Sequence, residues 1–556
     1  METPMSYDTQ KGREDLLAFE REQPDNFWRA DPHLQRVVRY WAGEDAVAAW
    51  EDDLDRFGGE CAGPIDQAVR ENNLNHNLPV LRRWGPYGDR IEEVEHHPSY
   101  HEAGRMIYGS GVMTALGEAG GNMHSQTLGF LSALNGEAGH NCPLACTAGV
   151  IKVMRALGSD ELKERYLPRL LSRDYEQLAH GAQFLTEVQG GSDVGANSVR
   201  AVPGDDGTWR IHGEKWFCSN VTADLILMTA RPEGAPEGTR GLGLFLVPRR
   251  TPDGEINRFF IRQLKDKLGT RSMASAELDF DGAFAWAMGP VEDGFKNMMT
   301  HVINTSRVFN AVGTSGIARR ACYIAHGYAT RRKAFGPSLI EYPLVQETLA
   351  DMRSETAAMT SGTFYLLHLM DRIERGEAGD EEIAFIRMAV NLNKMRSAQS
   401  SHDVTLSGVE MLAGNGAIES FSVLPRLIRD NMVFENWEGA HNVLLVQVLR
   451  DARRLALHEP FLSHLKAQAG EHPRIAGAID TWGAEVRSLL AEEDAAATLR
   501  IRQVGGRLAW IQWAAAMLAD GTEPALIEHF LDRRIGPEAT RDSAYLERIR
   551  TLSELP

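Results

Sequence analysis

The chain of 556 residues is too long for a single hydrophobic core, so we expect three or four domains. Its net charge of −18 at pH 7 argues against a protein that binds nucleic acid or an anionic membrane surface through its overall charge. Five cysteines are few for this length and odd in number, which fits a reducing compartment better than a disulfide framework.

The start of the chain lacks the basic and then apolar pattern of a secretory signal peptide, and no apolar run is long enough to span a bilayer. We therefore expect a cytoplasmic protein that does not enter the membrane. Cys142 and Cys146 are separated by three residues, but no second pair of cysteines accompanies them. An isolated pair of this kind is a weak metal-binding pattern, so we expect no metal site.

Residues 1–181 are predicted to form a mainly helical domain, because apolar residues between positions 100 and 171 recur near the helical period. Ser159 or Asp160 is a candidate N-cap for one of these helices. Residues 140–143 lie close to several glycines, which favours a loop. This loop either borders a ligand or connects two helices, and the sequence supports the two interpretations about equally.

Residues 182–290 have a different pattern. Short runs of apolar and β-branched residues alternate with turn sequences such as those at 203–207 and 252–254. No helix-length pattern interrupts these runs. We therefore predict a compact antiparallel β domain.

Residues 291–454 return to long helical patterns and are predicted to form a helical bundle. Residues 455–556 are predicted to form an additional helical domain, interrupted at 472–473 and at 521–524. The predicted fold class is therefore α+β and multidomain, with an N-terminal helical domain, a central antiparallel β domain, a helical bundle and an extra C-terminal helical domain.

The segment 183–193 combines small residues, hydroxyls and carboxylates directly after the N-terminal helical domain. Its two adjacent glycines allow the backbone to approach a ligand closely, and the hydroxyls of Thr186 and Ser192 can donate or accept hydrogen bonds. Backbone N–H groups in such a turn can also bind an anion. A turn of this composition is more often an ordinary loop, but a second motif at 213–220, on a predicted strand, favours a ligand site.

Five motifs, in the same order as in the acyl-CoA dehydrogenase flavoprotein family, make this chain resemble that family. The segment 185–193 resembles the flavin loop Thr-Glu-Pro-x-x-Gly-Ser-Asp, although Val188 stands where the family usually has proline. The segment 213–220 resembles a flavin-binding strand. The resemblance places Phe217 behind the isoalloxazine ring and the hydroxyl of Ser219 at flavin N5.

Three further motifs lie in the predicted helical bundle. Residues 332–336 resemble Arg-x-x-Phe-Gly, which in the family reaches the flavin of a neighbouring subunit. The resemblance therefore implies a homo-oligomer, which we expect to be a tetramer. Residues 410–416 resemble Gln-x-x-Gly-Gly-x-Gly, with Glu410 in place of the glutamine, and residues 437–442 resemble the Tyr-Glu-Gly-Thr motif that carries the catalytic base.

The resemblance covers residues from about 95 to 455 and implies FAD as the cofactor. A further family position departs from the pattern, since Pro343 replaces a flavin-contacting glutamine and Gln346 follows one turn later. The residues that the resemblance implies for FAD binding are Gln183, Leu185, Thr186, Gly191, Ser192, Phe217, Ser219, Arg332, Phe335, Glu410, Gly414, Ala440 and Asn442.

Oxidation of a saturated acyl thioester requires a base for the α proton and a hydride acceptor for the β carbon, and flavin supplies the acceptor. The resemblance implies Glu438 as the base, in a short loop where an apolar wall would raise its pKa toward a useful range. Without the other motifs, Glu438 would be interpreted as a glutamate at a helix start beside a packed tryptophan. The implied substrate-binding residues are Ser192, Arg307 and Gly439. Of these, Gly439 leaves room for the thioester carbonyl. For Arg307, an ordinary interhelical ion pair is an equally good interpretation.

The long N-terminal part and the helical block after the dehydrogenase portion resemble the AidB-like, alkylation-response branch of the family. Two functions follow from this. The first is an acyl-CoA dehydrogenase that passes electrons to an electron-transfer flavoprotein or to oxygen. The alternative is a protective, DNA-associated flavoprotein with weak or no dehydrogenase turnover. Residues 455–556 contain 11 basic and 15 acidic residues, which disfavours DNA binding, so the enzyme is the first expectation.

Overall fold

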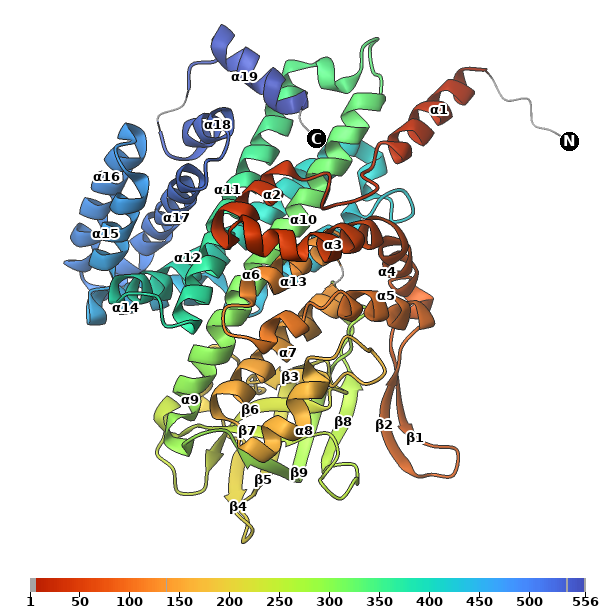
Figure 1. The fold of residues 1–556 in the computed structure, drawn as a ribbon, viewed down its shortest axis with the longest axis vertical. Coiled ribbons are helices and arrows are strands. Elements are labelled where there is room, and N and C mark those ends of the chain that lie inside the picture. Colours follow the sequence, from red (N-terminus) through yellow and green to blue (C-terminus); the bar gives the residue numbers. More distant parts are fainter. Residues whose placement is uncertain (1–6, 137, 537–538, 555–556) are drawn as a thin grey trace, which may run out of the picture. The chain divides into compact units, whose positions relative to one another are not determined.

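The computed structural model describes residues 7–136, 138–536 and 539–554. The chain divides into two compact units, whose course along the sequence can be followed in Figure 1. The sheet unit comprises the described residues of Pro64–Ser132 and Glu137–Asn310, and the bundle unit those of Met1–Gly63, Ala133–Gly136 and Ala311–Pro556. The described strands all lie in the sheet unit. The four domains expected from the sequence, and their bounds, stay a prediction.

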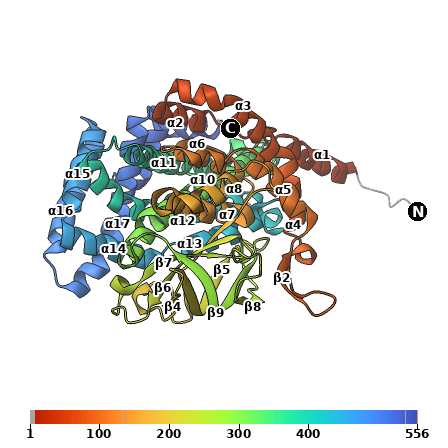
Figure 2. The same cartoon turned by 60° about the horizontal axis from the view of Figure 1, so that its bottom comes forward.

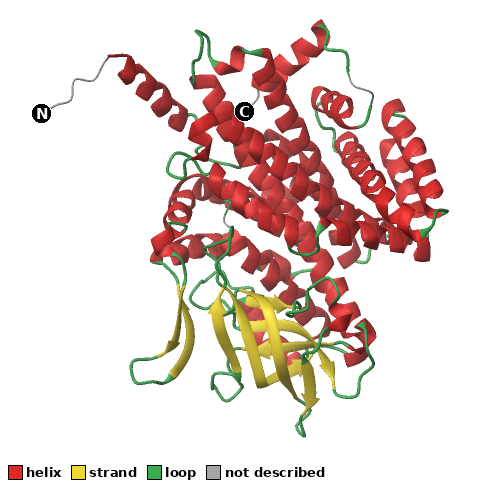
Figure 3. Ribbon diagram, turned by 180° about the vertical axis from the view of Figure 1, so that it is seen from behind, coloured by secondary structure: helices red, strands yellow, loops and turns green. Residues whose placement is uncertain are grey.

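Seven strands of the sheet unit form one sheet (Figure 3). Five of them pair in a closed circuit, because β6 pairs with both β4 and β7 while β5 and β9 complete the path. The remaining strands, β3 and β8, pair with β6 and β9. The strands are β3 (Gly181–Phe184), β4 (Arg200–Pro203), β5 (Trp209–Ser219), β6 (Leu225–Pro232), β7 (Gly243–Pro248), β8 (Phe259–Leu264) and β9 (Ser275–Ala287).

The sheet is mainly antiparallel, but β3 and β4 each pair with β6 in parallel. The predicted antiparallel domain is therefore correct for most strand pairs and wrong for these two. Turn sequences indicate only which consecutive strands form hairpins, whereas a parallel pair joins strands across intervening chain. The core of the sheet is made of fully buried side chains that include Val199, Ile211, Ile226 and Phe245.

A separate two-stranded hairpin, β1 (Val80–Trp84) and β2 (Arg90–Glu95), stands apart from the larger sheet in Figure 3. The sequence predicted only helix here, because charged residues in both strands hide the alternation that identifies a strand. A tertiary contact holds β2 in place, since the buried carboxylate of Glu92 accepts a hydrogen bond from the Ile261 N–H at 3.0 Å.

The predicted loop at 140–143 is instead part of helix α7 (Ala138–Leu157). Pro143 lacks the N–H that would bond to the Gly139 carbonyl in the helix, and the hydroxyl of Tyr100 donates to that carbonyl at 3.2 Å. A distant side chain thus replaces the missing helical bond, which local sequence patterns do not show. The predicted N-cap is confirmed, because the Ser159 hydroxyl accepts from the Leu162 N–H at the start of α8 (Asp160–Leu170).

The sheet unit contains four further α-helices among its described residues. They are α4 (Asp66–Asn72), α5 (Pro98–Gly109), α6 (Asn122–Ala133) and α9 (Gly294–Asn297). The N-terminal helices of the chain, which belong to the bundle unit, are α1 (Tyr7–Arg21), α2 (Pro32–Ala42) and α3 (Glu44–Glu60).

Long helices follow, as the sequence predicts. They are α10 (Asn304–Arg331), α11 (Pro343–Glu374), α12 (Asp380–Leu412), α13 (Leu424–Asn436) and α14 (His441–Leu455). Within the part of the chain that the structure describes, no helix is both long enough and apolar enough to cross a membrane.

The C-terminal block is helical and breaks at the two predicted places, since α16 begins at Pro473 and α18 at Pro524. Its first three helices lie side by side in Figure 2, and α17 packs on α11, where a Cβ atom at Gly362 would come within 2.1 Å of the Trp513 ring. The helices are α15 (His458–Ala469), α16 (Pro473–Leu490), α17 (Asp494–Ala519), α18 (Pro524–Arg534) and α19 (Ser543–Glu554).

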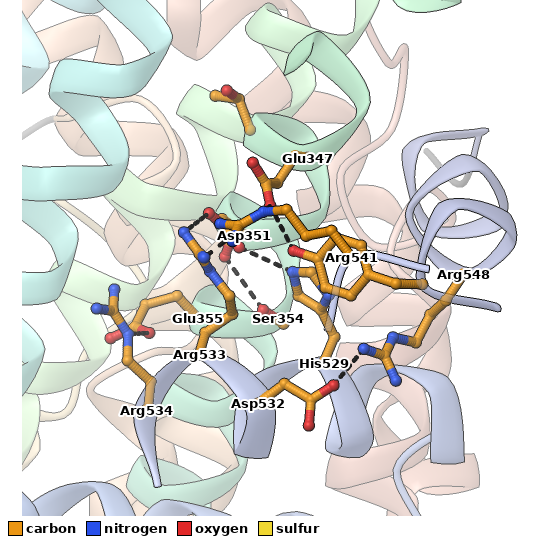
Figure 4. A network of polar contacts seen from close by, with 12 residues as sticks. Glu347, Asp351, Ser354, Glu355, His529, Asp532, Arg533, Arg534, Arg541 and Arg548 are labelled. Carbon is orange, nitrogen blue, oxygen red and sulfur yellow. Dashed lines mark hydrogen bonds and ion pairs between the residues drawn. The ribbon is translucent and has the colours of Figure 1, made fainter. Parts of the chain in front are cut away.

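Polar contacts fasten α18 and α19 to α11 (Figure 4). Asp351 on α11 accepts from His529 and from Arg533, each at 2.8 Å. One turn along α11, the buried carboxylate of Glu355 accepts from Arg534 at 2.7 Å. Two arginines of this block, Arg533 and Arg534, therefore hold α18 on α11.

Candidate functional site

The loop after β3 is joined to β5 by a buried ion pair. Lys215 on β5 donates from Nζ to Glu187 Oε1 at 2.8 Å, and both side chains are almost completely buried. The same ammonium donates to the Leu185 carbonyl at 3.0 Å, and the Trp216 N–H donates to the Thr186 carbonyl at 2.9 Å. Two motifs that are separate in the sequence thus form one rigid element.

Glu187 is also bound by the chain that follows the loop. Its carboxylate accepts from the N–H and the hydroxyl of Ser198, at 2.6 and 2.9 Å, and from the Val199 N–H at 3.2 Å. Burial by itself would raise the pKa of Glu187, but the Lys215 ammonium and these hydrogen bonds outweigh it and hold the pKa below its usual value. The lowered pKa favours the charged form of Glu187, whereas burial lowers the pKa of Lys215 despite the facing carboxylate.

The tip of the loop has room only for glycine at one position. A Cβ atom at Gly191 would lie 2.4 Å from Thr186 Oγ1, and Gly190 has φ +133°, which favours glycine. The turn is closed by the Gly190 N–H, which donates to the Glu187 carbonyl at 2.9 Å. Ser192 follows in exposed chain, so its hydroxyl and backbone are open to a ligand.

An irregular step in β5 exposes the predicted aromatic residue. Between Lys215 and Cys218, the pairing with β9 gains one extra residue on β5, as in a β-bulge. At this step the side chain of Phe217 is 55% exposed, which is unusual for phenylalanine in a sheet. Nearby on the strand, the Ser219 hydroxyl lies 2.9 Å from that of Ser275.

Gln183 connects this region to α10. Its Nε2 donates to the Ser306 hydroxyl at 3.2 Å, next to the predicted substrate residue Arg307. Arg307 is buried and donates weakly to Asn304 at 3.5 Å. The sheet unit thus brings together the predicted residues Gln183, Leu185, Thr186, Gly191, Ser192, Phe217, Ser219 and Arg307.

Glu438 lies in the bundle unit, in the short turn between α13 and α14. Its φ of +58° is in the left-handed region, which a residue with a side chain rarely adopts, and Gly439 follows with φ +111°. Trp437 packs against Phe434 with ring centroids 4.7 Å apart. Glu438 is therefore a turn residue held in an uncommon backbone conformation, and α14 begins only at His441.

The motifs do not reveal two basic side chains, one that contacts this turn and one that contacts the first turn of α14. Lys394 on α12 is fully buried and donates from Nζ to the carbonyls of Glu435 and Gly439, each at 3.0 Å. Arg502 on α17 donates to Asn442 Oδ1 at 3.2 Å, so the C-terminal block reaches a predicted cofactor residue. Both basic residues are far from the turn in the sequence, and no local pattern marks them.

His441 is next to the turn, and its imidazole is held neutral. Burial, the Lys394 ammonium and the Arg396 guanidinium lower its pKa to about 4. Gln399 contacts its Nδ1 at 3.1 Å. At neutral pH the helix start beside Glu438 therefore carries no additional positive charge from this ring.

The remaining predicted residues lie at two exposed positions of the bundle unit. Phe335 is completely exposed at the tip of a tight turn, with φ +55°, and Gly336 follows with φ +118°. The Leu339 N–H donates to the Arg332 carbonyl at 2.9 Å and closes this turn. The other predicted residues are Glu410 and Gly414, which are exposed at the C-terminal end of α12.

Comparison with known proteins is consistent with this organisation. Residues 20–177 match the adaptive response protein AidB N-terminal domain. Residues 182–283 match the acyl-CoA dehydrogenase middle domain, and residues 292–452 match the acyl-CoA dehydrogenase C-terminal domain.

The similar proteins cover most of the chain. Acyl-CoA dehydrogenase family member 11 from Caenorhabditis elegans is 29% identical over 94% of this chain and 86% of its own length. Putative acyl-CoA dehydrogenase AidB from Escherichia coli K12 is 30% identical over 72% of this chain and 74% of its own. The structure of C. elegans ACDH-11 in complex with C11-CoA superimposes with a TM-score of 0.84, at 27% identity and over 95% of each chain. The chain therefore belongs to the acyl-CoA dehydrogenase family and has an AidB-type N-terminal domain.

Proposed function

We propose that this protein is an FAD-dependent acyl-CoA dehydrogenase that removes hydrogen from the α and β carbons of an acyl thioester, with Glu438 as the base. The observation that carries the proposal is the turn at Glu438, a carboxylate held at positive φ and followed by a glycine. Strained backbone of this kind concentrates at functional sites. The C. elegans relative whose structure contains C11-CoA supports a thioester of coenzyme A as the ligand.

The residues of the sheet unit fit a planar, heteroaromatic cofactor. The exposed ring of Phe217 and the exposed side chain of Val188 offer apolar surface, and the Ser219 hydroxyl offers a hydrogen bond beside it. Exposed apolar groups next to hydroxyls and tight glycine turns are typical of a ligand site. When bound, FAD would supply the hydride acceptor for the β carbon.

Glu438 removes the α proton in this proposal. The bare Cα of Gly439 leaves space for the thioester carbonyl, and its neighbour Trp437 provides an apolar surface. Ser192 and Arg307 are proposed to bind the substrate. The rigid link between Glu187 and Lys215 keeps the cofactor loop in one conformation, so that less entropy is lost on binding.

Replacement of Glu438 by glutamine tests the base directly. The amide keeps the shape of the carboxylate but accepts no proton, so FAD should still bind while anaerobic flavin reduction falls by about 10²–10⁴-fold. The substrate is chosen from a screen of acyl-CoAs by flavin bleaching. Glu471→Gln is the matched control, because it makes the same chemical change at an exposed position outside the predicted site and should leave reduction unchanged. Wild-type reduction by Glu438→Gln would refute the assignment.

We also propose a homotetramer, with Phe335 and Arg332 contacting the cofactor of a neighbouring copy, and an electron-transfer flavoprotein or oxygen as the electron acceptor. The completely exposed Phe335 supports the first part, because a large apolar side chain on a strained turn is expected to be covered. Light scattering of the flavin-loaded protein tests it. A monomer mass with full flavin occupancy contradicts it.

A DNA-associated protective function is the second candidate, favoured by the match to AidB. The charges of the C-terminal block weigh against it. Arg533 and Arg534 pair with carboxylates of α11, and Arg548 pairs with Asp532 (Figure 4). Phosphate binding would have to compete with these contacts. Anisotropy of a labelled duplex at physiological salt tests this candidate, and salt-sensitive binding at micromolar protein would establish it.

A further inference from the structure

The turn that carries Glu438 is held by a lysine from another helix. The ammonium of Lys394 is fully buried and donates to the carbonyls of Glu435 and Gly439, each at 3.0 Å. These carbonyls are four residues apart and lie on either side of Trp437 and Glu438. One charged group on α12 therefore bonds to the chain immediately before and immediately after the left-handed residue.

The two acceptors explain why a charge is tolerated in the interior. Glu435 is in the last turn of α13, where backbone carbonyls lack helical N–H partners and carry the negative end of the helix dipole. Gly439 lies in the non-helical link to α14, where its carbonyl needs a partner as well. An ammonium has three donors and can serve both carbonyls, which a shorter neutral side chain cannot do.

The same two bonds restrict the conformation of Glu438. A residue with a side chain at φ +58° is less stable than in the right-handed region, so surrounding contacts must hold it there. Fixing the carbonyl before the turn and the carbonyl after it leaves the intervening residues little freedom. The direction in which the Glu438 side chain leaves the backbone is then set by Lys394.

We propose that Lys394 is a positioning residue, which holds the 437–440 turn with Glu438 in the left-handed region and thereby presents the Glu438 carboxylate to the substrate. The catalytic part of this proposal rests on Glu438 being the base. The structural part, the clamp on the turn, stands independently of the reaction.

Lys394→Met tests the clamp, because methionine keeps much of the side-chain volume and removes the charge and all three donors. Asn431→Leu is the matched control. Asn431 is also fully buried and crosses from α13 to α12, where its Nδ2 donates to the Ala398 carbonyl at 3.0 Å. The same Nδ2 lies 3.5 Å from the Glu435 carboxylate, but it bonds neither of the two backbone carbonyls that Lys394 holds. Both variants lose a buried hydrogen bond between the same two helices.

Two measurements separate positioning from general destabilisation. The first is amide hydrogen exchange of peptides covering 435–441 in the FAD-loaded protein without substrate. Exchange should become about tenfold faster in Lys394→Met and stay as in the wild type in Asn431→Leu. The second is anaerobic flavin reduction at increasing substrate. Its limiting rate should fall about 10- to 100-fold in Lys394→Met, with the half-saturating concentration changed much less, because a misplaced base slows the step without removing binding contacts.

The outcomes are distinct from those of the Glu438 experiment. Unchanged exchange in Lys394→Met, or the same faster exchange in Asn431→Leu, overturns the clamp. Faster exchange with a wild-type rate of reduction overturns the catalytic part, provided that Glu438→Gln is slow. If Glu438→Gln is reduced at the wild-type rate, the proposed function fails. The hydrogen-exchange measurement alone then tests whether Lys394 holds the turn. If Lys394→Met does not fold, Lys394→Gln, whose neutral amide keeps two N–H donors on a shorter side chain, takes its place and should show a smaller change in the same two readings.

Discussion

Two buried lysines, one in each unit, hold predicted site residues in different ways. Lys215 faces a carboxylate, that of Glu187, and also donates to one backbone carbonyl. Lys394 donates to two backbone carbonyls, those of Glu435 and Gly439. The charge of the first lysine is balanced by a carboxylate. The second lysine supplies hydrogen bonds to one carbonyl at the end of α13 and to one carbonyl in the link to α14. An ion pair therefore fixes a loop through side chains, and a carbonyl clamp fixes a turn through its backbone.

Breaking the ion pair should have the largest effect on stability. Lys215→Met leaves the Glu187 carboxylate buried without its cation, so the free energy of unfolding should fall by about 3–5 kcal/mol, and FAD affinity should fall with it. Urea unfolding and flavin titration measure the two effects. The double variant Glu187→Leu with Lys215→Met is the control. It should recover most of the stability, because no charge is left buried; if it is as unstable as the single variant, the uncompensated charge is not the cause.

The surroundings of Lys394 should respond to acid in a window set by His441. The pKa of this ring is lowered to about 4 in the folded protein, against an ordinary value of 6.5. The unfolded chain therefore binds the extra proton first, and stability should fall as pH drops from 6.5 toward 4. The loss at pH 5 should be about 1–2 kcal/mol. Urea unfolding of wild type and His441→Gln at pH 7 and pH 5 measures it.

Lys394→Met should reduce this acid loss, because the ammonium is one of the causes of the low pKa. The Lys215 pair behaves differently. Glu187 has a lowered pKa, so its contribution is complete above the ordinary glutamate range and is lost only at lower pH. Equal acid sensitivity of wild type and His441→Gln between pH 7 and pH 5 would contradict the assignment of this window to His441.

The loop held by the ion pair should tolerate little added volume. Gly191→Ala places a methyl group against Thr186 Oγ1, which can move only slightly, so the cost should be about 1 kcal/mol and should appear mainly as weaker FAD binding. Gly477→Ala is the control, because Gly477 lies in helix α16 with open space around it and without a positive φ. Flavin titration of the two variants measures the difference. Equal FAD affinities of the two variants would contradict the prediction, because the loop would then accommodate the added methyl group without cost.

The sequence by itself determined the local features of this protein. The helix start at Ser159 and the breaks at Pro473 and Pro524 depend on single side chains and their neighbours, and the structure confirms them. The change from helical to strand pattern near residue 182 also reflects local periodicity. The motifs indicated the family because each is a short run of chemically distinctive residues, and comparison with known proteins confirms it. The role of each site residue stays a prediction.

Only the tertiary structure decided which distant groups meet. The helix through Pro143 depends on a hydroxyl from Tyr100, and the parallel pairs of β6 depend on strands that are not its neighbours in sequence. Lys394 lies 41 and 45 residues from the carbonyls that it binds. Backbone carbonyls are present in every residue, so no sequence pattern can mark them as partners. Their alignment with one ammonium arises only when α12 packs against the end of α13.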